Sequence, residues 1–306
     1  MTGDNVLIEG ITFRNFNFTG YGGAIYWTGN NGVLKNCNFI NSTANIGGAI
    51  FWMGTEGTIT SSIFINNTAR VNGGSVRWEG IKGSLINSTF INSTAKASGG
   101  SIDWSGANGI IISSLFINNN APNFGGAIHW YGANGTLTSS RFNDNTAANG
   151  GAVYWNYGNA INGNLTDCIF INNHATTGGG VYWNGQKGTL STSTFINNSA
   201  NSNGGGIYWE GSNSSLINSI FSSNSATSGG AIFFWNVGSM FNCNFLNNYW
   251  IKSNGIYVRS NLTINGGNGI VDIVSPSIIS GISIVVLNNE TYYYPPNTNI
   301  NFTKLI

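Results

Sequence analysis

The chain has 306 residues, of which 41% are hydrophobic and only 7% are charged, and its formal net charge is +1. Basic side chains are few and unclustered, which disfavours binding to nucleic acid or to an anionic membrane surface. No apolar run reaches the roughly 20 residues of a transmembrane helix, so no transmembrane segment is predicted. Gly occurs 44 times and Pro only 4 times, so the composition favours an ordered, turn-rich protein over a Pro-rich linker.

A repeat of about 26 residues runs through most of the chain. Its first landmark is a Gly pair, such as Gly22-Gly23, that is followed by a short β-like segment ending in Trp. The Trp residues are Trp27, Trp52, Trp78, Trp104, Trp130, Trp155, Trp183 and Trp209, and Phe234 takes the place in a ninth copy. The second landmark is a Leu-x-x-Ser-x-Phe-Ile-Asn-Asn segment, whose Phe recurs at Phe39, Phe64, Phe90, Phe116, Phe142, Phe170, Phe195, Phe221 and Phe245.

Both segments are strand-sized and neither has the periodicity of a helix. Units this short cannot bury an apolar face alone, so they must stack on their neighbours. The sequence therefore predicts an all-β fold, a right-handed parallel β-helix of about nine regular coils over residues 22–250, within a β-helix domain of residues 1–280. Right-handedness is expected from the chirality of parallel β crossovers.

Stacking turns each repeat position into a column of side chains along the axis. The Trp residues and the Ile or Val two places earlier share one parity and should point inward. The residue between them should face solvent, because burial of Arg, Asp and His in this column would be costly. This outer column supplies the candidate ligand-binding residues, which are Tyr26, Phe51, Arg77, Asp103, His129, Tyr154, Tyr182, Tyr208 and Phe233.

Two further columns flank each Phe. The position two residues after Phe predicts an inward ladder of structural amides at a coil corner, where a glycan could not fit. It consists of Asn41, Asn66, Asn92, Asn118, Asn172, Asn197 and Asn247. The position two residues before Phe holds Cys37, Cys168 and Cys243, separated by about three coils or more. That separation predicts buried free thiols, and no metal site is predicted.

The repeat ends near residue 250. Irregular coils follow, and a new pattern over 281–306 predicts the start of a truncated immunoglobulin-like β-sandwich. Residues 1–5 lack the basic and apolar regions of a signal peptide, and the last residues stop inside a strand-like pattern. We therefore expect a piece of a longer secreted or cell-surface protein.

Gly-Gly-Ala-Ile at 22–25 and 125–128, with Phe-x-x-Asn at 64–67 and 170–173, resembles the repeats of chlamydial polymorphic outer-membrane proteins. The combination of these two motifs is still more similar to the repeats of adhesin-like surface proteins of methanogenic archaea. The resemblance covers residues 22–250 and implies a right-handed β-helix, a cell-surface or extracellular location and an adhesive role. It implies no catalytic residues and no cofactor, and the implied partners are glycans or proteins on a host or neighbouring cell.

Three functional hypotheses follow. The first is an adhesin whose outer aromatic residues bind sugars or a partner surface, although the same residues could only stiffen the sheet. The second is a β-helical polysaccharide lyase or glycoside hydrolase that uses Arg77, Asp103 and His129. The third is a purely structural cell-envelope protein. The second hypothesis is disfavoured because Asp103 is the only carboxylate among these three residues, whereas glycoside hydrolysis needs paired carboxylates.

Overall fold

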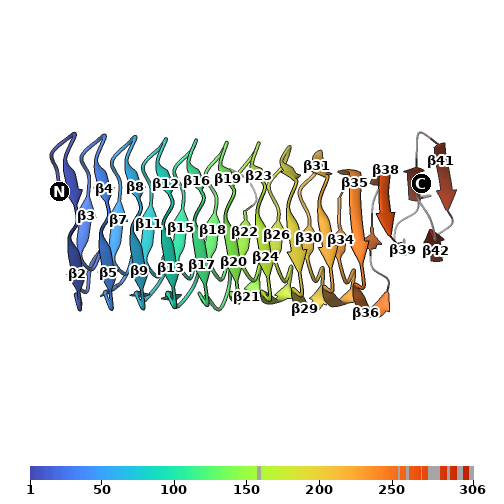
Figure 1. Cartoon of the computed structure of the whole chain (residues 1–306), viewed down its shortest axis with the longest axis horizontal. Helices are drawn as coiled ribbons and strands as arrows, with labels where there is room; N and C mark the ends of the chain where they lie inside the picture. Colours follow the sequence, from blue (N-terminus) through green and yellow to red (C-terminus); the bar gives the residue numbers. More distant parts are fainter. Residues whose placement is uncertain are drawn as a thin grey trace.

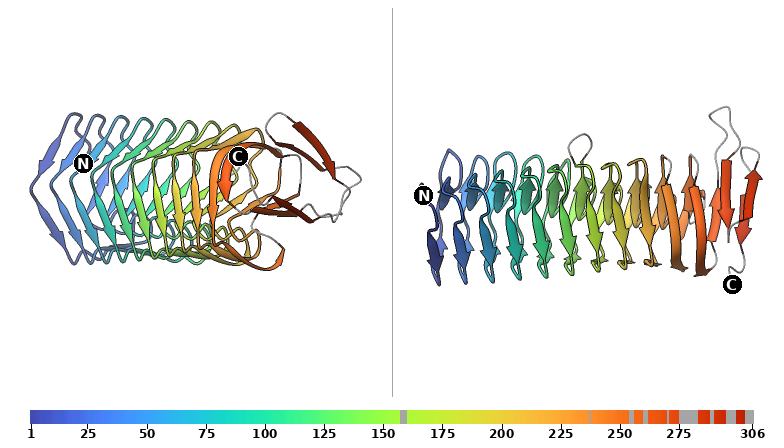
Figure 2. Two further views of the ribbon diagram at one scale, coloured as in Figure 1. Left: turned by 45° about the vertical axis from the view of Figure 1, so that its right-hand side comes forward. Right: turned by 90° about the horizontal axis from the view of Figure 1, so that it is seen from above.

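The computed structural model describes residues 1–156, 160–236, 238–253, 256–259, 262–269, 271–274, 283–287, 290–294 and 299–302. Within these ranges the regular structure is entirely β, and parallel strands stack coil upon coil along one axis (Figure 1). Figure 2 shows the same stack from two further directions, with the N-terminus at one end. The structure therefore confirms the predicted parallel β-solenoid of about nine coils with a spacing of about 26 residues.

Most coils contribute four short strands, which we name by an inward side chain. The Trp ladder consists of β3 (Ile25–Trp27), β7 (Ile50–Trp52), β11 (Val76–Trp78), β15 (Ile102–Trp104), β18 (Ile128–Trp130), β22 (Val153–Trp155), β26 (Val181–Trp183), β30 (Ile207–Trp209), β34 (Ile232–Phe234) and β37 (Ile256–Val258). The Leu ladder consists of β1 (Leu7–Glu9), β4 (Val33–Lys35), β8 (Thr58–Thr60), β12 (Ser84–Ile86), β16 (Ile110–Ile112), β19 (Thr136–Thr138), β23 (Asn164–Thr166), β27 (Thr189–Ser191) and β31 (Ser214–Ile217).

The Phe ladder consists of β2 (Thr12–Arg14), β5 (Asn38–Ile40), β9 (Ile63–Ile65), β13 (Thr89–Ile91), β17 (Leu115–Ile117), β20 (Arg141–Asn143), β24 (Ile169–Ile171), β28 (Thr194–Ile196) and β32 (Ile220–Ser222). A single longer strand, β35 (Gly238–Leu246), continues both the Leu and the Phe ladders. The Ala ladder consists of β6 (Thr43–Ala44), β10 (Thr68–Ala69), β14 (Thr94–Ala95), β21 (Thr146–Asn149), β25 (His174–Thr177), β29 (Ser199–Asn203), β33 (Ser225–Ser228) and β36 (Tyr249–Ser253).

Equivalent residues of successive coils are paired in register, as Trp78 with Trp104 and Phe90 with Phe116 show. The eight Trp rings are fully buried and stack with centroids 4.4 to 5.3 Å apart. The Phe rings form a second stack from Phe13 to Phe245, with centroids 4.5 to 5.2 Å apart. The core is thus made of continuous aromatic columns along the axis.

Left-handed backbone corners separate the strands of a coil. In one coil these corners are Glu56, Ser61, Asn66 and Gly73, with φ between 49° and 66°. Asn and Gly adopt this region at the lowest cost, which explains why Asn is so frequent in the repeat. The Gly corner is the most demanding, because a Cβ on Gly73 would lie 2.4 Å from the carbonyl oxygen of Val76.

A buried polar column lies three residues after each Phe. In it, Oδ1 of Asn145 accepts the backbone N–H of Asn119 at 3.0 Å, and its Nδ2 donates to the carbonyl of Phe116 at 3.1 Å. The pattern recurs at Asn67, Asn119, Asn173, Asn198, Asn224 and Asn248. These amides pair backbone groups that the corner leaves free.

The column predicted to be the inward amide ladder lies one residue earlier and points outward instead. Its side chains are exposed, and neighbours are bonded along the surface, as Asn118 Nδ2 donates to Asn92 Oδ1 at 2.8 Å. The correction applies to Asn41, Asn66, Asn92, Asn118, Asn172, Asn197 and Asn247. The left-handed corner at these residues reverses the alternation expected from a continuous strand. Burial therefore gives no argument against glycosylation at Asn41, Asn66, Asn92 or Asn197.

Cys37, Cys168 and Cys243 are free and buried, as predicted. They take the place of a Ser column, in which Ser62 Oγ accepts the backbone N–H of Cys37 at 3.1 Å. Burial raises the pKa of the Cys168 and Cys243 thiols to about 12. Both thiols therefore stay protonated at neutral pH, which makes them poor nucleophiles.

The solenoid extends beyond the regular repeat at both ends. At the N-terminal end, β1 pairs with β4 and β2 pairs with β5. At the other end, β38 (Leu262–Gly269) continues β35, and β39 (Val271–Val274) continues β37. Next come β40 (Ser283–Leu287), parallel to β38, then β41 (Glu290–Tyr294), antiparallel to β40, and β42 (Asn299–Phe302), antiparallel to β39. The β-sandwich over 281–306 stays a prediction.

Candidate binding site

The middle residue of each Trp-ladder strand points away from the core. Strand register brings these residues into one axial column, which we call the outer column. It contains Tyr26, Phe51, Arg77, Asp103, His129, Tyr154, Tyr182, Tyr208, Phe233 and Tyr257. All nine sequence-predicted ligand-binding residues therefore lie in one continuous line.

The expectation that the outer column faces solvent is wrong for most of its members. Tyr26 is 41% exposed and Arg77 and Tyr182 are half-buried, whereas the other predicted members are at most 9% exposed. Rings of successive coils cover one another, as Tyr182 and Tyr208 do with centroids 4.6 Å apart. Rings outside the column cover it further, as Phe124 does for Tyr154 with centroids 4.6 Å apart. The aromatic faces are therefore occupied within the protein.

The polar members of the column form a buried ion network. Asp103 is fully buried; its Oδ2 is paired with Arg77 Nη1, and its Oδ1 lies 2.9 Å from His129 Nδ1. Arg77 is also paired with Glu79 at 2.9 Å. The predicted cost of burying these charges is offset because each carboxylate oxygen of Asp103 has its own partner.

The ion network shifts the pKa of Arg77 and fixes the contacts of His129. Burial is the largest single influence and opposes the charge on the Arg77 guanidinium, but Asp103, Tyr131 and Glu79 together outweigh it and raise the Arg77 pKa above its ordinary value. On the far side of the network, His129 Nε2 lies 3.3 Å from Asn156 Nδ2. Nε2 can accept this amide N–H in the tautomer whose Nδ1–H donates to Asp103 Oδ1.

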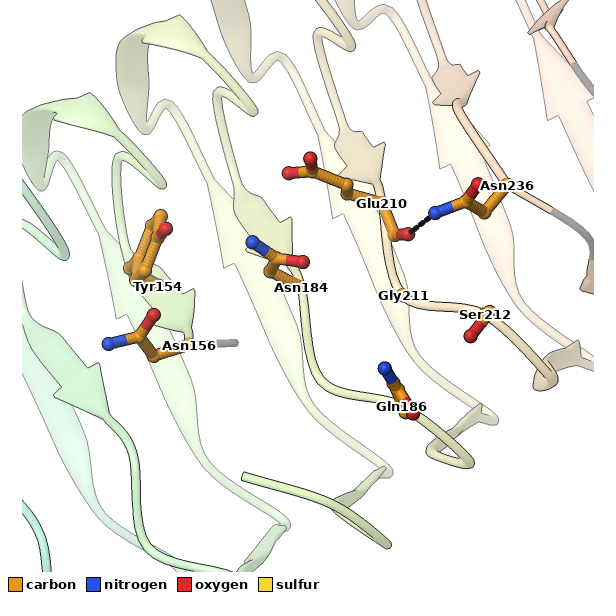
Figure 3. Close-up of a pocket in the computed structure, with 8 residues that line it drawn as sticks. All are labelled: Tyr154, Asn156, Asn184, Gln186, Glu210, Gly211, Ser212 and Asn236. Carbon is orange, nitrogen blue, oxygen red and sulfur yellow. Dashed lines mark hydrogen bonds between the residues drawn. The ribbon is translucent and has the colours of Figure 1, made fainter. Parts of the chain in front are cut away.

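An open polar hollow of about 370 Å³ lies beside the outer column in the second half of the solenoid. It is lined by Tyr154, Asn156, Asn184, Gln186, Glu210, Gly211, Ser212 and Asn236. Figure 3 shows the labelled side chains of Asn156, Asn184 and Glu210 following one another along the axis, with Gln186 and Ser212 further along the same turns. The hollow thus gathers amide, hydroxyl and carboxylate groups from consecutive coils.

Hydrogen bonds tie the hollow to the outer column. The hydroxyl of Tyr182 donates to Glu210 Oε2 at 2.5 Å, and Asn236 Nδ2 donates to the Glu210 carbonyl at 2.6 Å. Burial and the bond to Glu210 both raise the pKa of the Tyr182 hydroxyl above its ordinary value. Burial likewise raises the pKa values of Tyr154 and Tyr208. These hydroxyls stay protonated at neutral pH, and the hydroxyl of Tyr182 holds the Glu210 carboxylate in place.

The residues of the hollow outside the outer column are Asn156, Asn184, Gln186, Glu210, Gly211, Ser212 and Asn236, which the sequence reasoning did not single out. Their signal is the repeat position directly after Trp, which is occupied by Asn156, Asn184 and Glu210 in three consecutive coils. Such an array offers neutral donors and acceptors with one carboxylate, the set that recognises hydroxyl-rich ligands by hydrogen bonds.

Among the residues that the structure describes, no three His, Cys, Asp or Glu side chains gather in a way that could hold a metal ion. That part of the chain also has no helix of the length and apolarity needed to cross a membrane.

Comparison with known families matched two stretches, residues 113–129 and 192–208, to the Chlamydia polymorphic membrane protein repeat. Each stretch contains one Phe-x-x-Asn and one Gly-Gly-x-Ile segment, the landmarks of the fold described above. Comparison with curated proteins found no match. The repeat match and the β-solenoid together fit a surface-type repeat protein.

Proposed function

We propose that this chain is the β-solenoid of a cell-surface or extracellular adhesin and that the hollow beside Tyr182 binds glycans. The observation that carries the proposal is the convergence of Asn184, Gln186, Glu210 and Ser212 on one open hollow of about 370 Å³. A rigid solenoid holds these groups in fixed positions, so a ligand loses little affinity to reorganisation of the site.

The manner of binding differs from stacking on exposed aromatic faces. Because the ring faces of Tyr154, Tyr182 and Tyr208 are covered by their neighbours, a sugar in the hollow would meet only the edge of Tyr154, which lines it. Affinity would then come from hydrogen bonds to the amides and to Glu210. The outer aromatic column serves as the rigid support of the site.

A screen of the whole chain against neutral and acidic polysaccharides, with binding measured by surface plasmon resonance, tests the proposal. Loss of one neutral hydrogen-bond partner costs on the order of 1 kcal/mol, so Asn184→Ala and Gln186→Ala should each weaken binding about 5-fold to 10-fold. Asn201→Ala, which removes an exposed amide from the Ala ladder, is the control and should leave affinity unchanged. Equal binding by all three variants would exclude the hollow as the site.

Polysaccharide cleavage is the alternative function, since Asp103 and His129 form an acid–base pair. It has less support, because Asp103 is fully buried with both oxygens paired and so offers no free carboxylate to a substrate. The repeat match also suggests a non-enzymatic surface protein. Release of reducing sugar that is lost in Asp103→Ala would support cleavage. If neither ligand binding nor product release were detected, a purely structural cell-envelope role would be favoured.

A further inference from the structure

The hollow beside Tyr182 is lined by one charged side chain, the carboxylate of Glu210. The other lining residues are Tyr, Asn, Gln, Gly and Ser, which are all neutral. The class of glycan that such a hollow accepts depends on what surrounds this carboxylate, because a charged group discriminates between ligands of different charge more strongly than neutral groups do.

Two hydrogen bonds hold Glu210 in a fixed position. The hydroxyl of Tyr182 donates to Oε2 at 2.5 Å, and Asn236 Nδ2 donates to the backbone carbonyl of Glu210 at 2.6 Å. The Tyr182 ring is itself packed between those of Tyr154 and Tyr208, with centroids 4.8 and 4.6 Å away. A ligand therefore meets a carboxylate that is already oriented, and little conformational entropy is lost on binding.

No basic side chain balances this carboxylate within the part of the chain that the structure describes. Glu210 is half-buried and takes part in none of the ion pairs found there, and neither does Lys187 at its exposed corner. The guanidinium of Arg259 lies over the Trp235 ring, 3.6 Å from its centroid. Glu210 is thus a negative charge whose hydrogen-bonding partner, the Tyr182 hydroxyl, is neutral.

We propose that the hollow selects glycans that carry a free amino group, such as oligomers of glucosamine, an inference that rests on the glycan-binding function proposed above. An ammonium group supplies what Glu210 lacks, because it brings a positive charge together with three N–H donors. Asn184 precedes Glu210 by one coil at the same repeat position, and it adds a neutral acceptor along the axis (Figure 3).

Neutral and acidic glycans complement this site less well. The hydroxyls of a neutral sugar can donate to Glu210, but they leave the charge of the carboxylate uncompensated. Attraction between opposite charges is stronger in a partly buried site than in bulk water, which favours an ammonium group over a hydroxyl. An acidic sugar brings a second negative charge, and the resulting repulsion disfavours it.

Calorimetric titration of the whole chain with short oligomers tests the proposal at about pH 6, where an amine is protonated. Glucosamine and N-acetylglucosamine tetramers of the same linkage differ in the charge of the amine, and a uronic acid tetramer supplies the opposite charge. The amino tetramer should bind about 10-fold more tightly than either of the others. About 0.5 M NaCl should remove most of this difference, because salt screens the charges.

Variants of Glu210 assign the preference to its carboxylate. Glu210→Gln keeps the size of the side chain and removes the charge, so it should weaken binding of the amino tetramer about 10-fold to 100-fold. Binding of the N-acetylated tetramer should change no more than about 5-fold. Glu210→Asp keeps the charge and should retain more of the preference than Glu210→Gln. Lys187→Gln, the control, removes a nearby positive charge and should leave the order of the three ligands unchanged.

Failure of this selectivity can be told apart from failure of glycan binding itself. Equal binding of the amino and N-acetylated tetramers, with both weakened by Asn184→Ala, would overturn the selection for amines and leave the hollow as a glycan site. Tightest binding of the uronic acid tetramer, lost in Lys187→Gln, would overturn it as well. If none of the three tetramers bound, both the selectivity and the proposed glycan site would be wrong.

Discussion

At the scale of single residues, Asp103 holds the charged part of the outer column together. It is fully buried between Arg77 and His129, while Arg77 keeps a second partner in Glu79. Asp103→Ala leaves Arg77 and His129 partly unpaired in a buried setting, so we expect a loss of about 3 to 5 kcal/mol in the free energy of unfolding. Urea denaturation followed by Trp fluorescence measures it.

The matched control for Asp103 is Glu79→Ala. The Glu79 side chain is 34% exposed and its pair with Arg77 is screened by solvent, so this change should cost less than about 1 kcal/mol. If the two variants lost equal stability, the network would have to be stabilised by something other than the burial of Asp103.

The two Asn columns at each corner have different roles, which substitution can separate. Asn145→Ala would leave the N–H of Asn119 and the carbonyl of Phe116 without their amide partner in a buried corner. We expect a loss of about 2 to 4 kcal/mol, because two buried backbone groups become unsatisfied.

Asn118→Gly tests the exposed column of the same region. It keeps the left-handed corner accessible and removes only a surface amide bond, so its effect on the denaturation midpoint should be small, within about 0.5 kcal/mol. An effect of Asn118→Gly as large as that of Asn145→Ala would contradict the assignment of the buried column as the structural one.

At the scale of elements, each strand is too short to be stable alone, and the aromatic stacks join the coils. Trp130 lies between Trp104 and Trp155, with centroids 5.0 Å away on each side. Trp130→Ala should cost about 3 to 5 kcal/mol through the cavity it leaves. Trp130→Phe should cost less, since Phe234 already follows Trp209 in the ninth coil. Denaturation midpoints of the two variants give the comparison, and the same loss in both would argue against ring stacking as the source of stability.

The element scale also shows where prediction from the sequence succeeds and where it fails. Trp and Phe columns follow from spacing alone, because strand stacking turns a fixed repeat into an in-register ladder. The outward orientation of Asn118 could not be obtained that way, because alternation holds only within a strand and a left-handed corner at Asn118 interrupts it. The buried Asn119 is its immediate neighbour, so the error is one residue.

At the scale of the whole molecule, the solenoid was predictable but the environment of its surface was not. Asp103 is covered by Arg77 and His129, which lie 26 residues away on each side. The alternation of side chains along a strand predicts only that Asp103 points outward, so it does not reveal these partners. The hollow depends on Asn156, Asn184, Gln186, Glu210, Ser212 and Asn236, which become neighbours only after the coils are stacked. A column of polar residues after Trp was visible in the sequence, but its concavity was not.

The outer column also makes a prediction for the pH dependence of the whole fold. Burial raises the pKa values of Tyr154, Tyr182 and Tyr208 above their ordinary value. For Tyr182, the hydrogen bond to Glu210 raises the pKa further. A Tyr whose pKa is raised by folding contributes stability that is complete below the unfolded pKa of about 10 and is lost at higher pH. The free energy of unfolding should therefore be insensitive to these groups from pH 7 to 9 and fall steeply above pH 10.

Urea denaturation at successive pH values up to about 11.5, beyond the unfolded Tyr pKa, checks this dependence. Tyr182→Phe removes one of the titrating hydroxyls from the column and should flatten the alkaline decline, even if it lowers stability at neutral pH through loss of the bond to Glu210. An identical alkaline slope in the Tyr182→Phe protein would show that this hydroxyl is not held in its protonated form by the fold.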